Sequence, residues 1–363
     1  MDSIACIQSI NFECVVTEGI LPAMRALCWL VCACLACASS RRAHIDDAEL
    51  AGDMKAGALA FLASLTPQQE ERARFPIGHA QRLDWHYIPR ARPGVSLGEL
   101  TDSQRALAYG FLATALGRRG LLKASSIMAL EELLHRREQG RGAFVRDAGA
   151  YYLTVFGEPS TATTWGWRLE GHHLSINLTL VDGTHPISAP AFLGASLSTA
   201  TSRVLGREED LGLQLLASLD ADQRRMAIYN ATPPEDILAG PGAVLGELPG
   251  LAVARMTPSQ RGIFTALLDE LLASFPREIG ERERALVIAH GVGQITFTWA
   301  GAASRELPHY FRLSGPTFLY ELDNTQEQAT HVHSVWHARD PAGGDFGLDL
   351  LRDHYRNHPH GGH

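Results

Sequence analysis

Histidine is the residue type with the greatest potential for chemistry in this chain. The sequence contains 16 histidines, and two short clusters stand out, His172-His173 and His331-Val332-His333. In an extended segment, His331 and His333 project from the same face, because side chains alternate along a strand. Two imidazoles presented in this way are a common pair of ligands for one metal ion. A shared site requires the two clusters to meet in space.

We expect His331, His333 and one of His172 and His173 to bind a divalent metal ion. Imidazole ligands alone do not select among Zn²⁺, Cu²⁺ and Fe²⁺. Alternation along 172–180 places His172 with the apolar residues and leaves His173 as the freer histidine, although a bulge at Gly171 could exchange the two. The alternative interpretation gives these histidines a structural or solvent-facing role, which is the commoner role of a His-x-His pair on a strand.

Residues near the clusters could complete a catalytic or binding site. Glu170 and Asp345 are the carboxylates expected to act as a general base, and aspartates could also orient ligating imidazoles. The expected substrate-binding residues have aromatic, cationic or imidazole side chains and are Trp167, Arg168, Trp336 and His354. The structural alternative places the tryptophans in the core and pairs Arg168 with a local acid such as Glu170.

Other standard functions have little support in the sequence. It has no Walker loop, Gly-x-Ser-x-Gly, His-Glu-x-x-His or EF-hand loop, so no nucleotide cofactor is expected. The formal net charge of −8 gives no electrostatic support for nucleic-acid binding. A composition of 45% hydrophobic and 20% charged residues is typical of a soluble globular protein. The expected partner is an unidentified small molecule, and the oligomeric state is left open.

Four short segments predict the starts of helices that must position these residues. Each has Thr or Asp followed three residues later by Gln, which is the pattern of a capping box. The segments are 65–69, 100–104, 219–223 and 256–260. The spacing within the first pair is nearly the same as that within the second pair, which indicates a repeat.

A β-rich stretch follows each pair of helix starts, and Arg-Leu-x-Gly recurs at 168–171 and 312–315. We therefore predict an α+β fold made of a duplicated helix-pair plus antiparallel β unit, with helices packed on a mixed or antiparallel sheet and one shared core. The single globular domain is expected over 39–357, with the copies at about 45–200 and 201–340. The second copy has Pro316-Thr317 where the first has His172-His173, so the repeated fold does not require the histidine pair.

The N-terminal segment predicts export. All six cysteines lie in its first 37 residues, and an apolar run over 26–38 follows Met24-Arg25. This pattern predicts a signal peptide over 1–38, because the run is shorter than the ~20 residues of a membrane span. Acidic residues within 1–23 do not fit a signal peptide, so this stretch is expected to be an over-extended start.

The predicted location is therefore periplasmic or extracellular. One alternative is a lipoprotein anchored through Cys34 or Cys37, and another is a cytoplasmic protein with a buried N-terminal helix. At the other end, the histidine-rich segment 358–363 is expected to be a frayed tail that binds metal only adventitiously.

Three segments together resemble a known family. They are the stretches 165–177, with Glu170-Gly171-His172-His173, then 331–336, and then 345–355 with Asp345-Phe346-Gly347. They are similar to the family called domain of unknown function 3500, over about residues 45–357. The resemblance implies export and supports the choice of histidines, but it implies no reaction.

We therefore expect an exported metal-dependent enzyme, a hydrolase or an oxidoreductase, with a site built from histidines. One alternative is a non-catalytic periplasmic or extracellular protein that binds a ligand or metal. A further alternative is metal-free acid–base catalysis by His173 and Glu170.

Overall fold

A computed structural model describes residues 47–139, 141, 146–196, 203–243, 246–340 and 344–345. The chain divides into two compact units, Met1–His44 and Ile45–His363, and every described residue belongs to the second unit. The signal peptide predicted over 1–38 and the tail predicted over 358–363 lie outside the described residues. Within the described part of the chain, no helix is both long enough and apolar enough to cross a membrane.

All four predicted capping boxes are present, and each starts a helix. In every case the Thr or Asp side chain accepts a hydrogen bond from the amide of the Gln, and the Gln side chain accepts one in return. The helices that begin in this way are α3 (Pro67–Ala73), α4 (Asp102–Ala115), α7 (Ala221–Ala227) and α8 (Pro258–Leu272). The others are α2 (Asp47–Ser64), α5 (Arg118–Glu138), α6 (Gly206–Ser218) and α9 (Arg277–Ala289).

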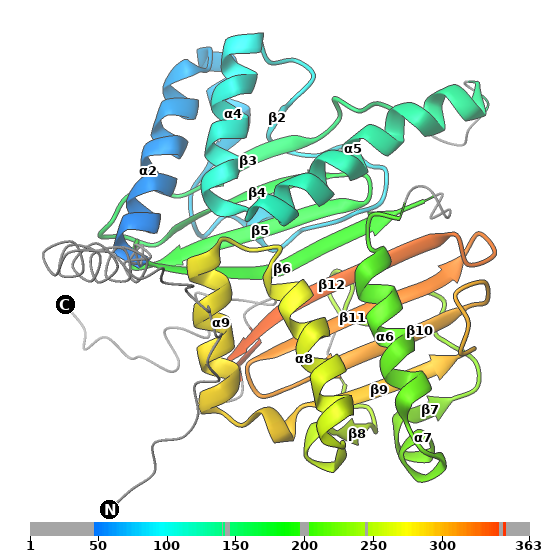
Figure 1. Ribbon diagram of the computed structural model, residues 1–363. Coiled ribbons are helices and arrows are strands. Elements are labelled where there is room, and N and C mark those ends of the chain that lie inside the picture. Colours follow the sequence, from blue (N-terminus) through cyan, green and yellow to red (C-terminus); the bar gives the residue numbers. More distant parts are fainter. Residues whose placement is uncertain are drawn as a thin grey trace, which may run out of the picture. The chain divides into compact units, whose positions relative to one another are not determined.

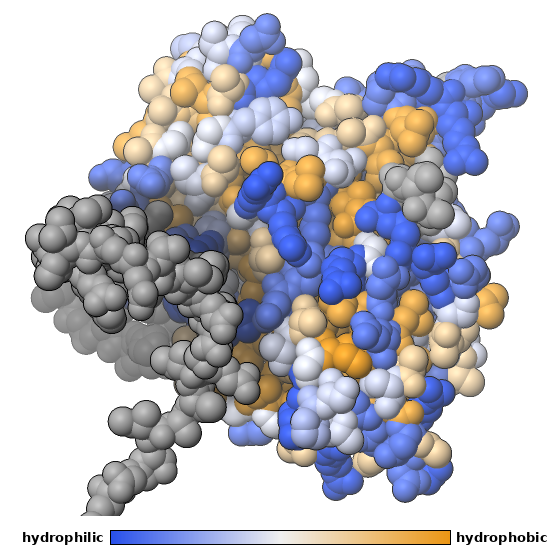
Figure 2. Space-filling model, in the orientation of Figure 1, coloured by the Kyte–Doolittle hydropathy of each residue, from blue (hydrophilic) through white to orange (hydrophobic). Residues whose placement is uncertain are grey.

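The longer helices cover one face of a single sheet (Figure 1). Their apolar side chains pack with those of the strands in one large core that includes Phe111, Trp167, Leu215, Phe264 and Trp336. Figure 2 shows the outer side of this helical layer, where hydrophilic and hydrophobic residues are interspersed. The helices therefore turn their more continuous apolar faces toward the sheet.

The sheet has 13 strands and is mixed, which confirms the α+β class. Its main path is β1-β3-β4-β5-β6-β12-β11-β10-β9-β7; pairing is antiparallel except between β1 and β3 and between β7 and β9. The strands of this path are β1 (Arg74–Phe75), β3 (Tyr152–Phe156), β4 (Trp165–Gly171), β5 (Leu174–Val181), β6 (His185–Ala195), β12 (His331–Asp340), β11 (Phe318–Gln326), β10 (His309–Ser314), β9 (Thr296–Gly301) and β7 (Ile228–Asn230). Off the path, β2 (Val95–Ser96), β8 (Leu251–Ala252) and β13 (Gly344–Asp345) pair with β3, β9 and β12.

The order of elements is the same on both sides of the central β6–β12 pair. Each side has an outer parallel strand, then four antiparallel strands that reach the centre. The caps are also tied together in the same way, since Gln104 donates to Gln69 over 2.9 Å and the corresponding Gln260 donates to Gln223 over 2.7 Å. This is the arrangement that a duplication predicts; the duplication itself stays a prediction, because a matching order of elements does not test common ancestry.

Two long loops cover part of the sheet face opposite the helices: 76–94, and the described parts 231–243 and 246–250 of the segment between β7 and β8. Trp85 and Tyr87 of the first loop and Ile237 of the second pack with Phe192 and Val335 in a second, smaller apolar cluster. The two loops come from corresponding places in the two halves, between β1 and β2 and between β7 and β8.

Buried arginines hold both loops on the sheet. Arg168 of β4 donates to the carbonyl oxygens of Asp84 and Arg82, each over 2.9 Å. Arg312, at the matching place on β10, donates to the carbonyl oxygen of Gly246 over 2.8 Å. Its partner Glu321 accepts hydrogen bonds from two backbone amides of the second loop. Charge-assisted bonds to backbone therefore fix the loops that complete the site described next.

Candidate metal centre

The two histidine clusters meet where the halves of the sheet join. His331 and His333 lie on the loop-covered face of β12, and His173 reaches them from the connection between β4 and β5. The Nε2 atom of His331 lies 2.7 Å from Nε2 of His173 and 3.0 Å from Nε2 of His333. All three side chains are buried, and together they form a group that could hold a metal ion.

The surroundings of His172 and His173 differ from the prediction. The two residues form the turn between β4 and β5, because the last ladder pair joins Gly171 to Leu174. His173 is only 4% exposed and His172 is half-buried, so the prediction that His173 is the freer histidine is wrong. The physical reason is that alternation describes a strand, and it ends at the turn.

The backbone of His173 is held in an unusual conformation from both sides. Its φ of 62° lies in the left-handed region that residues other than glycine rarely adopt. Its amide donates to the carbonyl oxygen of Tyr87, and its own carbonyl accepts from the amide of Gly194, each over 2.8 Å. The first loop and strand β6 thus fix the direction of this imidazole.

Asp236 of the second loop orients His333. The Nδ1 atom of His333 lies 2.8 Å from Asp236 Oδ1, and the Tyr87 hydroxyl donates to Asp236 Oδ2 over 3.0 Å. Burial alone would lower the pKa of His333, but the hydrogen bond that it donates to Asp236 and the charge of Asp323 raise it overall. With the Nδ1 proton directed at Asp236, the neutral imidazole presents a lone pair at Nε2, as a metal ligand must.

The other two imidazoles are held neutral. Burial, reinforced by neighbouring histidines, lowers the pKa of His331 to about 3 and places that of His173 well below its usual range. His173 and His331 can therefore present Nε2 lone pairs, whereas His333, whose pKa is raised, does so once its Nε2 proton is lost. A cation at the centre would accept all three lone pairs.

A second carboxylate, which unlike Asp236 is fully buried, lies behind His333. Asp323 Oδ2 is 3.8 Å from His333 Nδ1, and this oxygen has no hydrogen-bond partner among the described residues. Burial raises the pKa of Asp323 to about 7. Asp236 and Asp323 therefore both act on the nitrogen of His333 that faces away from the histidine group.

His172 belongs to a neighbouring cluster rather than to the three converging nitrogens. Its ring stacks on that of His173 with 3.8 Å between centroids, and its Nδ1 lies 2.7 Å from Glu131 Oε1. Arg146 lies 3.0 Å from the same nitrogen. His172, Glu131 and Arg146 line a cleft of about 110 Å³, so this cleft begins one ring away from the metal-ligand candidates.

The expected general base Glu170 and the expected substrate residue Arg168 form a buried ion pair with 3.0 Å between Nη1 and Oε2. Arg92 also donates to Glu170, over 2.8 Å, and the backbone amide of His86 donates to it over 3.1 Å. Through these contacts Arg168 and Glu170 help to hold the first loop on the sheet. The pairing of Arg168 with Glu170 is the one that the structural alternative predicts.

The two tryptophans among the candidates lie apart from the three nitrogens. Trp167 packs against Phe111 in the helix-side core. Trp336 projects from β12 on the face opposite His333 and stacks on Phe318, with 4.6 Å between centroids. Of Asp345 only the backbone is described, paired with Arg339, and His354 lies outside the described residues.

Sequence reasoning missed the groups that orient the histidines. Asp236 and Tyr87 lie in irregular loops, where no periodicity predicts their direction. Asp323 and Glu131 are acidic residues within a strand and a helix, and nothing in their local pattern separates them from surface acids. Only the fold brings these four residues to the histidines.

The fold and the site define an α+β protein in which three imidazoles from two halves of one sheet form a candidate metal centre. The chain belongs to the family described as "Protein of unknown function (DUF3500)", whose model matches residues 47–348. This match confirms the resemblance noted in the sequence. Comparison with the curated proteins and with the solved structures found no match.

Proposed function

We propose that this protein is an exported metal-dependent enzyme whose divalent ion, Zn²⁺, Cu²⁺ or Fe²⁺, is bound by His173, His331 and His333. The convergence of three buried Nε2 atoms within hydrogen-bonding distance carries the proposal. Asp236 would orient His333 from behind, as carboxylates commonly do for ligating imidazoles.

The number of ligands favours catalysis over a purely structural role. Structural zinc sites usually have four protein ligands, whereas catalytic sites have three and leave a position for water or substrate. Within the described residues, the group around His331 contains three ligating side chains. A metal bound there would supply a Lewis acid that activates water or, if it is redox-active, oxygen.

The cleft beside His172 is the proposed place for the substrate. Its lining combines Glu131 and His172 with three arginines, Arg90, Arg92 and Arg146. Because His172 stacks on His173, a molecule in this cleft would lie close to the metal. The arginines already have carboxylate partners, so a substrate would meet an array of paired charges rather than a free cation.

Metal analysis tests the first part of the proposal. The full chain, produced without a purification tag and with the tail histidines 358, 360 and 363 replaced by alanine, should contain close to one metal ion by plasma mass spectrometry. His331→Ala and His333→Ala should lose it. His337→Ala is the matched control, because His337 lies buried on the same face of β12 but bonds the carbonyl oxygen of Ala239. Equal metal content in all of these proteins would refute the site.

The non-catalytic alternative predicts a filled coordination sphere. Substitution with Co²⁺ makes the centre visible in absorption spectra, and azide should shift these spectra if a position is open to solvent. Spectra unchanged by azide, together with bound metal, would favour capture of a metal without turnover. Identification of the native metal then separates hydrolysis from oxidation, since Zn²⁺ has no redox chemistry.

Export rests on the predicted signal peptide over 1–38. N-terminal sequencing of the protein isolated from its natural host should begin close to residue 39. A mature chain that retains the apolar run over 26–38 would contradict this part of the proposal, and a lipid on Cys34 or Cys37 would favour the anchored alternative.

A further inference from the structure

A pocket lies on the other face of the sheet, between the central strands and helices α5, α6 and α8. Ser334 and Trp336 of β12 line it, whereas His333 between them points to the opposite face. The pocket has a volume of about 40 Å³, which corresponds to roughly three water-sized groups. It is therefore distinct from the histidine site and from the cleft beside it.

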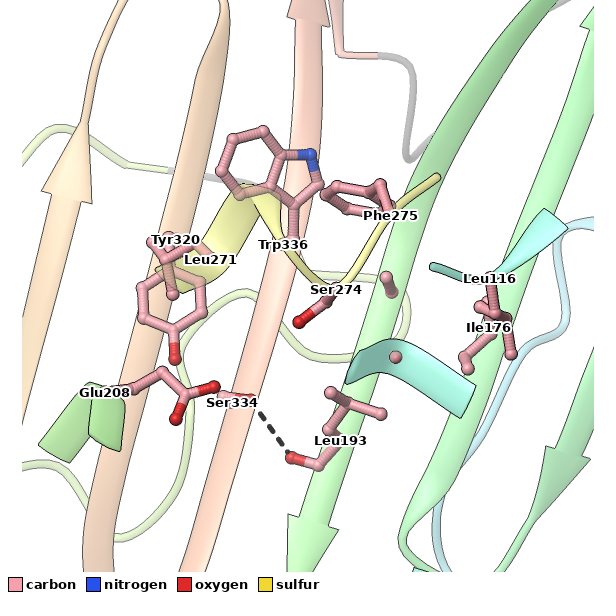
Figure 3. Close-up of a pocket in the computed structure, with 12 residues that line it drawn as sticks. Leu116, Ile176, Leu193, Glu208, Leu271, Ser274, Phe275, Tyr320, Ser334 and Trp336 are labelled. Atoms are coloured by element: carbon pink, nitrogen blue, oxygen red, sulfur yellow. Dashed lines mark hydrogen bonds between the residues drawn. The ribbon is translucent and has the colours of Figure 1, made fainter. Parts of the chain in front are cut away.

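Two buried polar groups in this pocket lack partners. Glu208 and Tyr320 are 2% and 4% exposed. Glu208 Oε2 has no hydrogen-bond partner among the described residues, and the Tyr320 hydroxyl, which lies beside the Ser334 hydroxyl, donates to no described acceptor. Figure 3 shows both groups at the same end of the pocket. Unmet hydrogen bonds of this kind are costly in a protein interior, so each such group calls for an explanation.

The neighbouring polar groups are already engaged. Glu208 Oε1 accepts a bond from Lys123, which also donates to Ser274 Oγ over 3.0 Å. Ser334 Oγ donates to the carbonyl oxygen of Leu193 over 3.2 Å. Two hydrogen-bonding groups are therefore left unmet: Glu208 Oε2 can accept a hydrogen bond, and the Tyr320 hydroxyl can donate one.

The rest of the wall is apolar. Ile176, Leu193, Leu271, Phe275 and Trp336 line the pocket, with Trp336 and Phe275 close together in Figure 3. Water could bond to the two polar groups, but it would leave this apolar wall without partners. A group that is polar at one end and aliphatic at the other would satisfy both parts of the pocket.

We propose that this pocket binds a small aliphatic alcohol, or the hydroxyl end of a larger aliphatic molecule. A hydroxyl group has the required complement, since it accepts a hydrogen bond from Tyr320 and donates one to Glu208 Oε2. Its alkyl chain packs on Trp336 and the leucines. Positive charge on the ligand is not required, because Lys123 already lies beside Glu208 and partly balances its charge.

Binding of 1-propanol tests this proposal. Saturation-transfer NMR on the full chain should give a dissociation constant that rises about five- to tenfold in Tyr320→Phe, the loss expected for one hydrogen bond. Tyr229→Phe is the matched control, because Tyr229 is half-buried on β7 and does not line the pocket. Its dissociation constant should equal that of the unmodified protein.

A steric variant gives an independent test. Ala191 lines the pocket, so Ala191→Leu should fill the space and abolish saturation transfer to 1-propanol. If Tyr320→Phe fails to fold, Ala191→Leu still tests whether the alcohol binds in this pocket. Absence of binding to the unmodified protein, or equal binding by Ala191→Leu, would overturn the proposal. A crystal structure grown with 1-propanol that shows only water between Glu208 and Tyr320 would overturn it as well. Neither result would bear on the histidine site.

Discussion

Replacing Gly194 with alanine should weaken metal binding while leaving the fold in place. Gly194 lies on β6 beside the histidine group, and its amide bonds the carbonyl oxygen of His173. A Cβ atom at this position would lie 2.8 Å from His333 Cδ2 and 3.3 Å from His173 Cδ2. The added methyl group would therefore overlap sterically with His333 and contact His173 closely, and these are two of the three proposed ligands.

The size of the effect follows from these distances. Ordinary contact of a Cβ atom begins near 3.4 Å, so the His333 ring or β6 must move by about 0.6 Å. Metal–imidazole bonds of ~2.0–2.1 Å tolerate deviations of only about 0.2 Å. His333 cannot turn freely, because Asp236 holds its Nδ1 atom. We expect metal affinity to fall about 10- to 100-fold, or roughly 1.4–2.7 kcal/mol.

Competition with a coloured chelator measures this affinity directly. Gly212→Ala is the matched control, because its Cβ would lie 2.6 Å from Phe311 Cε1 in the core, and its three nearest atoms all belong to Phe311. Both variants should lose about 1–3 kcal/mol of unfolding free energy from overpacking. Only Gly194→Ala should lose metal. Wild-type affinity in Gly194→Ala, or an equal loss in Gly212→Ala, would refute the argument.

Three further outcomes are expected. Asp236→Asn should lower metal affinity about 10- to 100-fold with the same metal bound, and an unchanged chelator competition would show that Asp236 does not orient His333. Arg168→Met should lower the free energy of unfolding, measured in urea, by about 3 kcal/mol, because it frees the first loop and leaves Glu170 with one fewer cationic partner. Arg225 is exposed, so the control Arg225→Met should change this free energy by less than about 0.5 kcal/mol. Equal losses in the two variants would contradict the anchoring role of Arg168. Burial raises the pKa of Glu283 above its usual 4.5, so the stabilising contribution of this residue is complete below pH 4.5 and is lost as the pH rises through the raised pKa. Glu283→Gln should therefore raise the urea midpoint of unfolding at pH 8 but not at pH 4. A shift of the same size at both pH values would disprove this assignment.

Local rules predicted the parts of the fold that depend on neighbours in sequence. The capping boxes at Thr66, Thr101, Asp220 and Thr257 mark helix starts correctly, because a cap involves residues three apart. Alternation also places His331 and His333 on one face of β12, since that stretch is a regular strand.

The same rules could not predict how the site is completed. His172 and His173 lie in a turn, where direction depends on bonds to Tyr87 and Gly194 rather than on periodicity. Asp236 reaches His333 only because Glu321 and Arg312 hold its loop on the sheet. Such long-range contacts have no counterpart in local sequence, so the orienting carboxylates were found only in the structure.

Because the proposed ligands come from both β12 and the β4–β5 turn, metal binding would be coupled to the association of the two halves of the sheet. Since His173 belongs to one half of the sheet and the other two histidines to the opposite half, neither half alone can bind the ion with three nitrogens. At a metal concentration 100 times the dissociation constant, binding stabilises the joined state by about 2.7 kcal/mol. An ion bound there would act as a non-covalent cross-link at the β6–β12 seam, so that separation of the halves and release of the metal would be a single cooperative event.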